Sequence, residues 1–400
     1  MLGGAWQRTV ERGLFTIVLF GVSVCFCGRV ALGQRVAIGL YDNVDLQSVT
    51  ISPVSKGYRV LLDGKVRPLP SGQSLDARRD GNILAVRVNG QPLGGYRHVA
   101  VINDAVATQL SIEAGEGGAD RRILDGNLSL TVDFQRVMCV NLVDQECYVA
   151  SVVLAEVGSG QGAELYKAQA LLVRTYLLAH RGRHINEGFN LCDQVHCQAY
   201  KQSAWGNETI RGATLATRGQ VVVDGDGRLI ASVFHANCGG QTASAEQVWL
   251  TPQSYLRSVK DPDCAGANGS RWKAVVPLKE WRRLLSSKGI AAYQLTAEQM
   301  AYRSTRREAI YALPGGRGVP FRDLREYFNL RSAWFDVEVR GDKVYLKGRG
   351  YGHGIGMCQR GAMAKAQKGY SAAQILQAYF FGVKVVPAEQ ALPMATLYDE

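Results

Sequence analysis

Asp144 to His180 read DQECYVASVVLAEVGSGQGAELYKAQALLVRTYLLAH, and this stretch decides how the rest of the chain is interpreted. It holds two apolar patterns at helical spacing, from Tyr148 to Val153 and from Leu165 to Ala179. The glycine-rich break from Gly158 to Gly162 separates them. The stretch therefore predicts two consecutive helices joined by a short loop.

Glu156 is the only acidic residue between Glu146 and Glu164, and it lies two residues before the glycine break. A carboxylate in the last turn of a helix meets the negative end of the helix dipole and several unpaired carbonyl groups. Partial burial would raise its pKa further, so that it could donate a proton near neutral pH. The alternative is an exposed glutamate at a frayed helix end, and the stretch alone leaves both interpretations open.

Length and composition indicate a folded, basic protein. Its 400 residues predict one large domain or two modest ones, and its 46% hydrophobic and 20% charged residues are typical of a globular chain. A formal net charge of +11 favours anionic partners such as nucleic acid, an acidic membrane surface or a cell-wall polymer. The basic residues are scattered, without a run of five or more, so we expect no nucleic-acid partner.

Residues 1–33 have the layout of a secretory signal peptide. Arg8 and Arg12 precede a 14-residue apolar run, Leu14 to Cys27, and a small-x-small site follows at residues 31–33. The run is shorter than the roughly 20 residues that span a membrane, although an uncleaved anchor is the alternative. We therefore expect an exported protein of the cell envelope, in the periplasm or on the extracytoplasmic face of the membrane, with at most an N-terminal membrane anchor.

The remaining pattern predicts an α+β fold. Residues 34–125 consist of short alternating runs with hairpin signals at Asp63-Gly64 and Asn89-Gly90, and form a β-rich N-terminal region. Residues 126–382 mix helical and strand patterns, ending in a helix that Ser371 and Gln374 open at capping-box spacing. Residues 383–400 are expected to be a C-terminal tail.

Four residues in one loop could hold Zn²⁺: His184, Cys192, His196 and Cys197. Adjacent His196 and Cys197 would point to opposite faces of a regular strand, so a shared ion requires a turn. A Cys192–Cys197 disulfide with two bystander histidines, or free thiols, are the alternatives. Seven cysteines follow the predicted signal peptide, and this odd number leaves at least one thiol unpaired or some of them bound to metal.

Two further segments carry residues that could do chemistry. His235 and Cys238 precede Gly239-Gly240, which suggests a thiol nucleophile, but a structural role or a disulfide with Cys264 is favoured because their spacing on an extended chain keeps them apart. Residues 348–356 carry glycine at every second position, which lets another backbone or a sugar ring approach closely. His353 lies in this glycine frame, and we expect it to be a site residue more than a core histidine.

The order of these motifs is more specific than any one of them. The chain reads Asp144-x-x-Cys-Tyr-Val-Ala-Ser-Val-Val-Leu-Ala-Glu156, then Lys167-Ala-Gln-Ala170 and Arg174-Thr-Tyr176, then His235 with Gly239-Gly240-Gln-Thr242, and finally Gly350-Tyr-Gly-His-Gly-Ile-Gly-Met-x-Gln359-x-Gly361. This succession resembles the SpoIID family, the stage II sporulation protein D and amidase-enhancer (LytB) type of cell-wall protein. The resemblance covers roughly residues 126–382.

The resemblance implies a lytic transglycosylase that cuts the bond between N-acetylmuramic acid and N-acetylglucosamine in peptidoglycan strands stripped of stem peptides. Glu156 lies where the family has its catalytic glutamate, although Ala155-Glu156-Val157-Gly158 replaces the usual Gly-Glu-Met-Pro. One acid suffices, because it can protonate the leaving oxygen and then deprotonate the muramic 6-hydroxyl, which closes a 1,6-anhydro ring. No cofactor is required for this chemistry.

The resemblance also implies further site residues. The residues expected to bind the substrate are Arg174, His235, Gln241, Tyr351, His353 and Gln359. Some family members bind zinc through Cys and His in the loop after the second helix, which favours a structural zinc at His184, Cys192, His196 and Cys197. Cys238 and Cys358 replace the serines that the family commonly has, and this puts those contacts in doubt.

Two other functions compete with the transglycosylase. One is a non-catalytic wall-binding or amidase-enhancing protein of the same fold, with a cell-wall amidase as its partner. The other is a Cys/His peptidase or amidase that uses Cys238 or Cys358 as its nucleophile.

Overall fold

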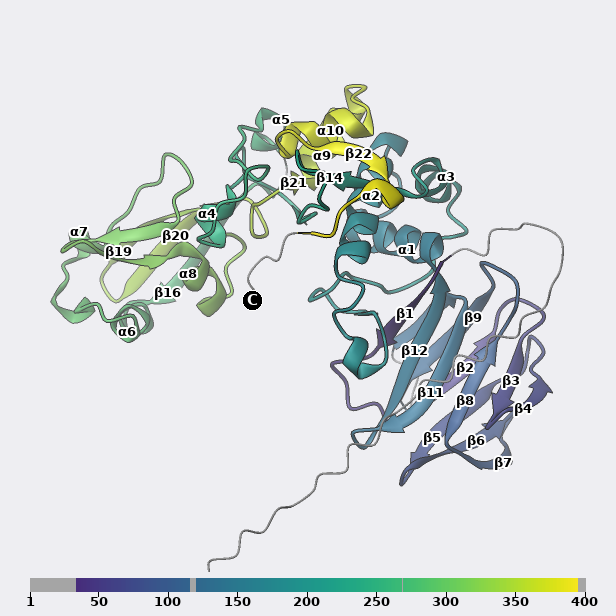
Figure 1. Ribbon diagram of the computed structural model, residues 1–400. Helices are drawn as coiled ribbons and strands as arrows, with labels where there is room; N and C mark the ends of the chain where they lie inside the picture. Colours follow the sequence, from purple (N-terminus) through teal and green to yellow (C-terminus); the bar gives the residue numbers. More distant parts are fainter. Residues whose placement is uncertain (1–33, 116–119, 268, 395–400) are drawn as a thin grey trace, which may run out of the picture. The chain divides into compact units, whose positions relative to one another are not determined.

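The computed structural model of the protein describes residues 34–115, 120–267 and 269–394. They form an α+β structure, as predicted, with a β-rich first part followed by mixed helices and strands (Figure 1). The predicted signal peptide, residues 1–33, lies outside the described residues. Within those residues, no helix has both the length and the apolar character needed to cross a membrane.

The first part is a sandwich of two sheets that share one hydrophobic core (Figure 1). The first sheet has the order β13-β1-β12-β11-β8-β3-β4. Its strands are β1 Arg35–Leu40, β3 Arg59–Leu62, β4 Lys65–Pro68, β8 His98–Ile102, β11 Asn127–Asp133, β12 Arg136–Asp144 and β13 Leu191–Cys192. The second has the order β10-β9-β2-β5-β6-β7. Its strands are β2 Ser48–Pro53, β5 Leu75–Asp80, β6 Ile83–Val88, β7 Gln91–Tyr96, β9 Gln109–Ala114 and β10 Asp120–Asp125.

Both predicted hairpins of the sandwich are present. Asp63-Gly64 joins β3 to β4 and Asn89-Gly90 joins β6 to β7, and all four residues have the positive φ that such tight turns require. The predicted boundary between residues 125 and 126 separates β10 from β11, yet β11 pairs with β8 and β12 pairs with β1. The sandwich therefore extends to Asp144, where the first helix begins.

The two predicted helices follow this sandwich directly. They are α1 Gln145–Val157 and α2 Ala163–Ala179, and α3 Glu208–Ala216 packs against both. Asp144 caps α1, because its Oδ1 accepts hydrogen bonds from the backbone N–H groups of Glu146 at 2.8 Å and Cys147 at 3.4 Å. The strand β12 thus passes into α1 without a loop, which fixes the start of the helix that carries Glu156.

A second core lies between α2 and the C-terminal helices. It involves two short sheets, β14 Gln220–Val223 with β22 Lys384–Pro387 and β15 Phe234–His235 with β21 Met357–Cys358. Its helices are α4 Ala245–Val248, α5 Pro262–Ala265, α9 Gln359–Gln367 and α10 Ala372–Tyr379. The predicted tail begins at 383, but β22 lies inside it and is paired with β14. The capping box of Ser371 and Gln374 at the start of α10 is confirmed.

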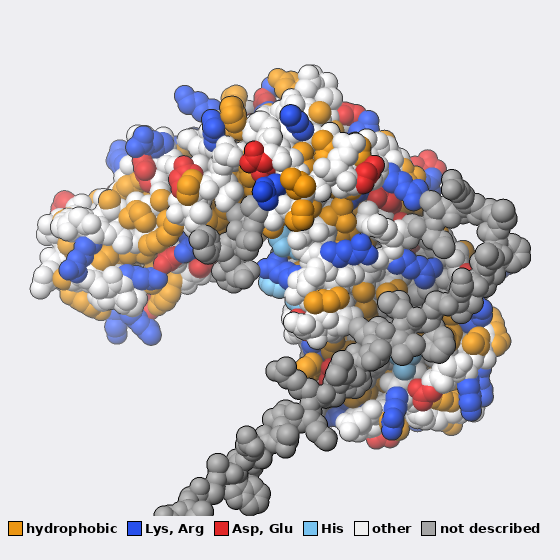
Figure 2. Space-filling view, in the orientation of Figure 1, with side chains coloured by type: hydrophobic (Ala, Val, Ile, Leu, Met, Phe, Trp, Pro, Cys, Tyr) orange, Lys and Arg blue, Asp and Glu red, His pale blue; other side chains and the backbone are white. Residues whose placement is uncertain are grey.

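A third core belongs to residues 271–349. The sheet has the order β16-β20-β19, with β16 Arg271–Pro277, β20 Lys343–Arg349 and β19 Phe335–Arg340. A hairpin of β17 Ile310–Leu313 and β18 Arg317–Pro320 accompanies α6 Leu278–Ser287, α7 Ala297–Met300 and α8 Phe321–Tyr327. Figure 2 shows that Lys and Arg side chains are scattered over the visible face, as the sequence indicated.

Candidate functional site

Glu156 lies in the last turn of α1 and is partly buried. The backbone N–H of Ala199 donates a hydrogen bond to its Oε1 at 3.3 Å. Burial raises the pKa of the carboxyl above its ordinary 4.5, while the Ala199 N–H and the Lys201 charge act in the opposite direction. No acidic side chain of the described residues contributes to this shift of the pKa. The site thus contains a carboxyl group that holds its proton to a higher pH than an ordinary glutamate does.

The residues after Glu156 hold the helix end firmly. Val157 is buried in the first core, and Gly158 ends the helix with a φ of 73°. Tyr166 of α2 donates its hydroxyl to the Gly158 carbonyl at 3.0 Å and accepts from the Gln161 N–H at 2.9 Å. Val157-Gly158 therefore gives Glu156 an anchored helix end in place of the family's Met-Pro.

Gln359 connects the glycine-rich motif to Glu156. Its Nε2 donates to the backbone carbonyl of Glu156 at 3.3 Å, and its side chain is buried. It thereby satisfies one of the carbonyl groups that a helix leaves unpaired at its C-terminus. Gln359 is thus a positioning residue at the end of α1.

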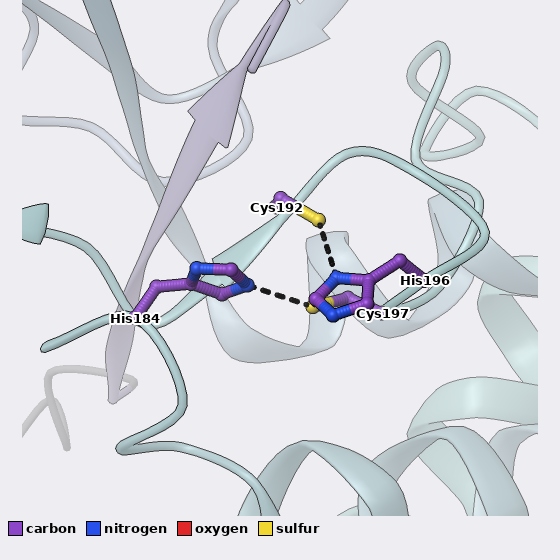
Figure 3. A group of neighbouring side chains, drawn as sticks. All are labelled: His184, Cys192, His196 and Cys197. Atoms are coloured by element: carbon purple, nitrogen blue, oxygen red, sulfur yellow. Dashed lines mark hydrogen bonds between the residues drawn. The ribbon is translucent and has the colours of Figure 1, made fainter. Parts of the chain in front are cut away.

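His184, Cys192, His196 and Cys197 come together as the sequence predicted (Figure 3). One ligand atom of each lies within 4.8 Å of all the others. The required turn is present, because the N–H of Cys197 donates to the carbonyl of Gln194 at 2.9 Å. All seven cysteines of the described residues, Cys192 and Cys197 included, are free thiols.

The donor set fits Zn²⁺, which prefers thiolate and imidazole ligands. His184 also has the outer partner that metal-bound histidines usually have, because its Nδ1 lies 2.6 Å from Glu187 Oε1. Its Nε2 faces Cys197 Sγ at 3.4 Å, while Cys192 Sγ lies 3.6 Å from His196 Nδ1. In the pair of thiols, the hydrogen bond from Cys197 lowers the pKa of Cys192, which favours a thiolate.

This Cys/His cluster is linked to Glu156 through a short stretch of backbone. Ala199, which donates to Glu156, follows Cys197 by two residues. The intervening Gln198 accepts a hydrogen bond from the Tyr148 hydroxyl of α1 at 3.2 Å. An ion in the cluster would therefore fix the loop that presents the Ala199 N–H. Sequence reasoning missed Ala199 and Lys201, because a backbone donor and an unpaired lysine leave no pattern.

Arg174 has a structural environment. It is fully buried and pairs with Glu146, with Nε–Oε1 at 3.0 Å and Nη2–Oε2 at 2.5 Å. Its remaining N–H groups point to the carbonyls of Gln220 and Thr214, at 3.1 and 3.3 Å. Every face of this guanidinium is occupied by the protein. The expectation that it binds sugar does not fit this placement, and we give it no such role.

His235 and His353 lie against each other, with ring centroids 5.5 Å apart. Both ring nitrogens of His353 are used, because Nε2 donates to the Phe234 carbonyl at 2.8 Å and Nδ1 accepts from the Ile355 N–H at 3.1 Å. Burial lowers the pKa of His353 to about 4 and that of His235 well below its ordinary value, so both rings are neutral at pH 7. His353 therefore resembles the satisfied core histidine that was the less favoured alternative.

Because the glycines around His353 have no side chain, the segment that contains His235 and Asn237 can pack closely against them. A Cβ at Gly350 would lie 2.6 Å from the Asn237 carbonyl oxygen, and one at Gly352 would lie 2.9 Å from the His235 Cβ. Tyr351 alternates with them and is 55% exposed. The close approach of another backbone, which the glycine pattern allowed, is present at Gly350 and Gly352.

Cys238 and Cys358 are not placed for nucleophilic attack. Both have no exposed surface, and the backbone N–H of Cys238 donates to the sulfur of Cys358 at 3.2 Å. A thiol nucleophile must reach its substrate, so the Cys/His peptidase hypothesis is contradicted by this burial.

Comparisons with known proteins give the same family as the sequence motifs. The family model described as Stage II sporulation protein, SpoIID, matches residues 134–223, the segment from β12 through α1 and α2 to β14. The family model and the curated relatives support the SpoIID family for this chain. The chain is 28% identical over 290 residues to Stage II sporulation protein D of Bacillus amyloliquefaciens, covering 69% of this chain and 83% of that one.

Two Bacillus subtilis proteins are also similar. Stage II sporulation protein D of strain 168 is 28% identical over 271 residues, covering 63% of this chain and 77% of the relative. The protein named Amidase enhancer is 24% identical over 285 residues, covering 58% of this chain but only 39% of the relative.

Proposed function

We propose that the protein is a peptidoglycan lytic transglycosylase that cuts the bond between N-acetylmuramic acid and N-acetylglucosamine. The observation that carries this proposal is the carboxyl of Glu156, held at the end of α1 with a raised pKa to which no acid of the described residues contributes. A glycosidase that uses two carboxylates needs one on each side of the scissile bond. Internal attack by a sugar hydroxyl needs only one acid, which first donates a proton and then accepts one.

The reaction proceeds in two proton transfers. Protonated Glu156 donates to the glycosidic oxygen as the bond to the anomeric carbon breaks, and positive charge develops at that carbon. The carboxylate then takes the proton of the muramic 6-hydroxyl, whose oxygen bonds to the anomeric carbon. The products are a 1,6-anhydromuramic end and a free N-acetylglucosamine hydroxyl. Glu156 is protonated again, and no water is consumed.

A basic cavity supports glycan stripped of stem peptides as the substrate class. The cavity has a volume of about 310 Å³, and Gln241, Lys260, Arg271, Trp334 and Arg349 lie on its wall. A muramic residue without its peptide carries a free lactyl carboxylate, and cationic and indole groups suit such a sugar acid. Gln241 and exposed Tyr351 remain our proposed sugar-binding residues.

We also propose a structural zinc at His184, Cys192, His196 and Cys197. Such an ion would stabilise the loop and leave the acid–base chemistry to Glu156. The Ala199 N–H would thereby stay directed at Glu156 Oε1, 3.3 Å away. The expected export to the cell envelope and a cell-wall amidase as partner belong to the same proposal, the latter resting on the relative named Amidase enhancer.

The test is mass spectrometry of peptide-free glycan after incubation with wild-type protein, Glu156→Gln and the control Glu208→Gln. Glu208 is an exposed glutamate on α3, so its substitution keeps the charge change but touches no proposed site. We expect 1,6-anhydro ends from wild type and the control, and a loss of at least about 100-fold in Glu156→Gln. Reducing ends alone would indicate a hydrolase and refute the mechanism.

A non-catalytic, amidase-enhancing function is the second candidate. The similarity to the protein named Amidase enhancer favours it, as do the structural roles of Arg174 and His353. It predicts glycan binding without any new ends from the wild-type protein, and stimulation of an added amidase that Glu156→Gln leaves unchanged.

A further inference from the structure

A second cluster of metal-ligand type lies in the second core and consists of Cys238, Asp261, Cys264 and Cys358. One ligand atom of each lies within 4.8 Å of all the others, and all four side chains are fully buried. They come from three distant segments: the end of β15, the start of α5 and the junction of β21 with α9. Nothing in the local sequence requires three thiols and an acid to meet there.

Backbone donors converge on the sulfur atoms. The N–H groups of Cys238 and Gly361 donate to Cys358 Sγ at 3.2 and 3.4 Å, and the second of these caps the N-terminus of α9. The positive end of a helix and two N–H donors stabilise a thiolate far more than a neutral thiol. These two donors would stabilise Cys358 as a metal-bound thiolate.

Asp261 is oriented by groups on its outer side. Its Oδ1 accepts from Lys365 Nζ at 2.9 Å, and its Oδ2 accepts from the Tyr379 hydroxyl at 2.8 Å and faces Cys238 Sγ at 3.4 Å. Carboxylate ligands of metal ions are usually held by such outer hydrogen bonds. One oxygen of Asp261 thus points at the thiols while a buried cation holds the other.

Arg307 places a further positive charge beside the cluster. It is 3% exposed and donates to the carbonyls of Cys238 at 2.8 Å and Gln241 at 2.7 Å, and within the described residues it forms no salt bridge. A buried cation without a counter-charge is costly. Metal-bound thiolates in the adjacent cluster would supply a counter-charge for Arg307.

A divalent cation is compatible with the charges of the site. With all three sulfurs as thiolates, they and Asp261 carry four negative charges, and Lys365 and Arg307 supply two positive ones. Asp263, which also contacts Lys365 at 2.9 Å, is offset by Lys368. A doubly charged ion leaves this buried site neutral.

We propose that Cys238, Cys264, Cys358 and Asp261 form a structural Zn²⁺ site, separate from the Cys/His cluster. Tetrahedral Zn²⁺ bonded to sulfur at about 2.3 Å needs ligand atoms about 3.8 Å apart, which the present spacing reaches with a small contraction. The ion cross-links the segments after β15, before α5 and before α9. It thereby holds the start of α9, where Gln359 contacts the Glu156 carbonyl. The site stands whether or not Glu156 is catalytic.

The first test counts zinc in the full exported chain, purified under argon without reductant. We expect Cys238→Ser/Cys264→Ser to lose one zinc ion per chain relative to wild type, and His196→Ala/Cys197→Ser to keep that ion. Cys139→Ser is the matched control, because this cysteine is also buried but lies outside both clusters. Zinc content unchanged by the double cysteine variant would overturn the proposal.

A second test needs only wild-type protein and so does not depend on variants that fold. Differential alkylation with peptide mass spectrometry follows Cys238, Cys264 and Cys358 in the native protein, after denaturation alone, and after denaturation with a chelator. A zinc site predicts that all three resist alkylation in the native protein and react faster after denaturation with the chelator than after denaturation alone, without reductant. Equal reaction in the two denatured samples would indicate buried free thiols and overturn the site. A disulfide predicts that two of the three react only after reduction, and this result would overturn the site.

Discussion

Replacing Arg174 by methionine tests whether this arginine has a structural role or binds the substrate. The change leaves Glu146 buried, 4% exposed, without the guanidinium that donates to both of its oxygens. Breaking a buried ion pair from one side costs about 3–5 kcal/mol, because the remaining charge is uncompensated. Total stabilities of folded domains are about 5–15 kcal/mol, so this loss is a large fraction. We expect the free energy of unfolding to fall by that amount.

Urea unfolding followed by helical circular dichroism measures the loss. The companion variant Glu146→Leu/Arg174→Met removes both charges, and we expect it to recover about 1–3 kcal/mol relative to the sum of the two single changes. Because Arg174 has no exposed surface, the double variant should still bind peptide-free glycan as wild type does. Arg174→Met that unfolds like wild type yet no longer binds glycan would refute the structural assignment.

Three further outcomes follow from the site. Gln359→Leu removes the donor to the Glu156 carbonyl, so it should lower the free energy of unfolding in urea by about 0.5–1.5 kcal/mol and lower the rate of glycan cleavage. The control Gln367→Leu, at an exposed position on α9, should change neither quantity. Because burial raises the pKa of Glu156, its acid form persists above pH 4.5. In a pH–rate profile, the cleavage rate should therefore fall with rising pH at a higher pH than the pKa of an ordinary glutamate would give. A fall at the ordinary pKa would contradict this. Gly361→Ala would drive a methyl group into Asp261 and should lower the melting temperature in a thermal scan.

Local signals predicted the local structure well. The helices α1 and α2, the hairpin turns at Asp63-Gly64 and Asn89-Gly90, and the capping box of α10 each depend on residues a few positions apart. The extent of the sandwich was not predictable in this way, because β11 and β12 belong to it only through pairing with β8 and β1. Alternation of apolar and polar residues predicts that a strand is present, but it does not predict which sheet the strand joins.

The roles of single polar residues depended on contacts that no spacing reveals. Arg174 meets Glu146 from 28 positions away, and His353 bonds to the Phe234 carbonyl across 119 positions. The sequence around such a histidine or arginine is the same whether its side chain contacts a sugar or lies in the protein core. The gathering of Cys238 with Cys358, 120 positions apart, is of the same kind. Only the fold decides which buried partners such side chains have.

Glu156 illustrates how these long-range contacts converge on one group. Ala199 reaches its carboxylate from the loop of the Cys/His cluster, and Gln359 reaches its carbonyl from the helix that begins at Cys358. Residues next to the two clusters of metal-ligand type therefore contact the same glutamate from two distant segments of the chain. With Val157 buried and Gly158 bonded to Tyr166, the acid is fixed on each side by a different part of the chain. The general acid that we propose Glu156 to be needs its carboxyl kept partly out of water and in one orientation, and these four contacts are consistent with both conditions.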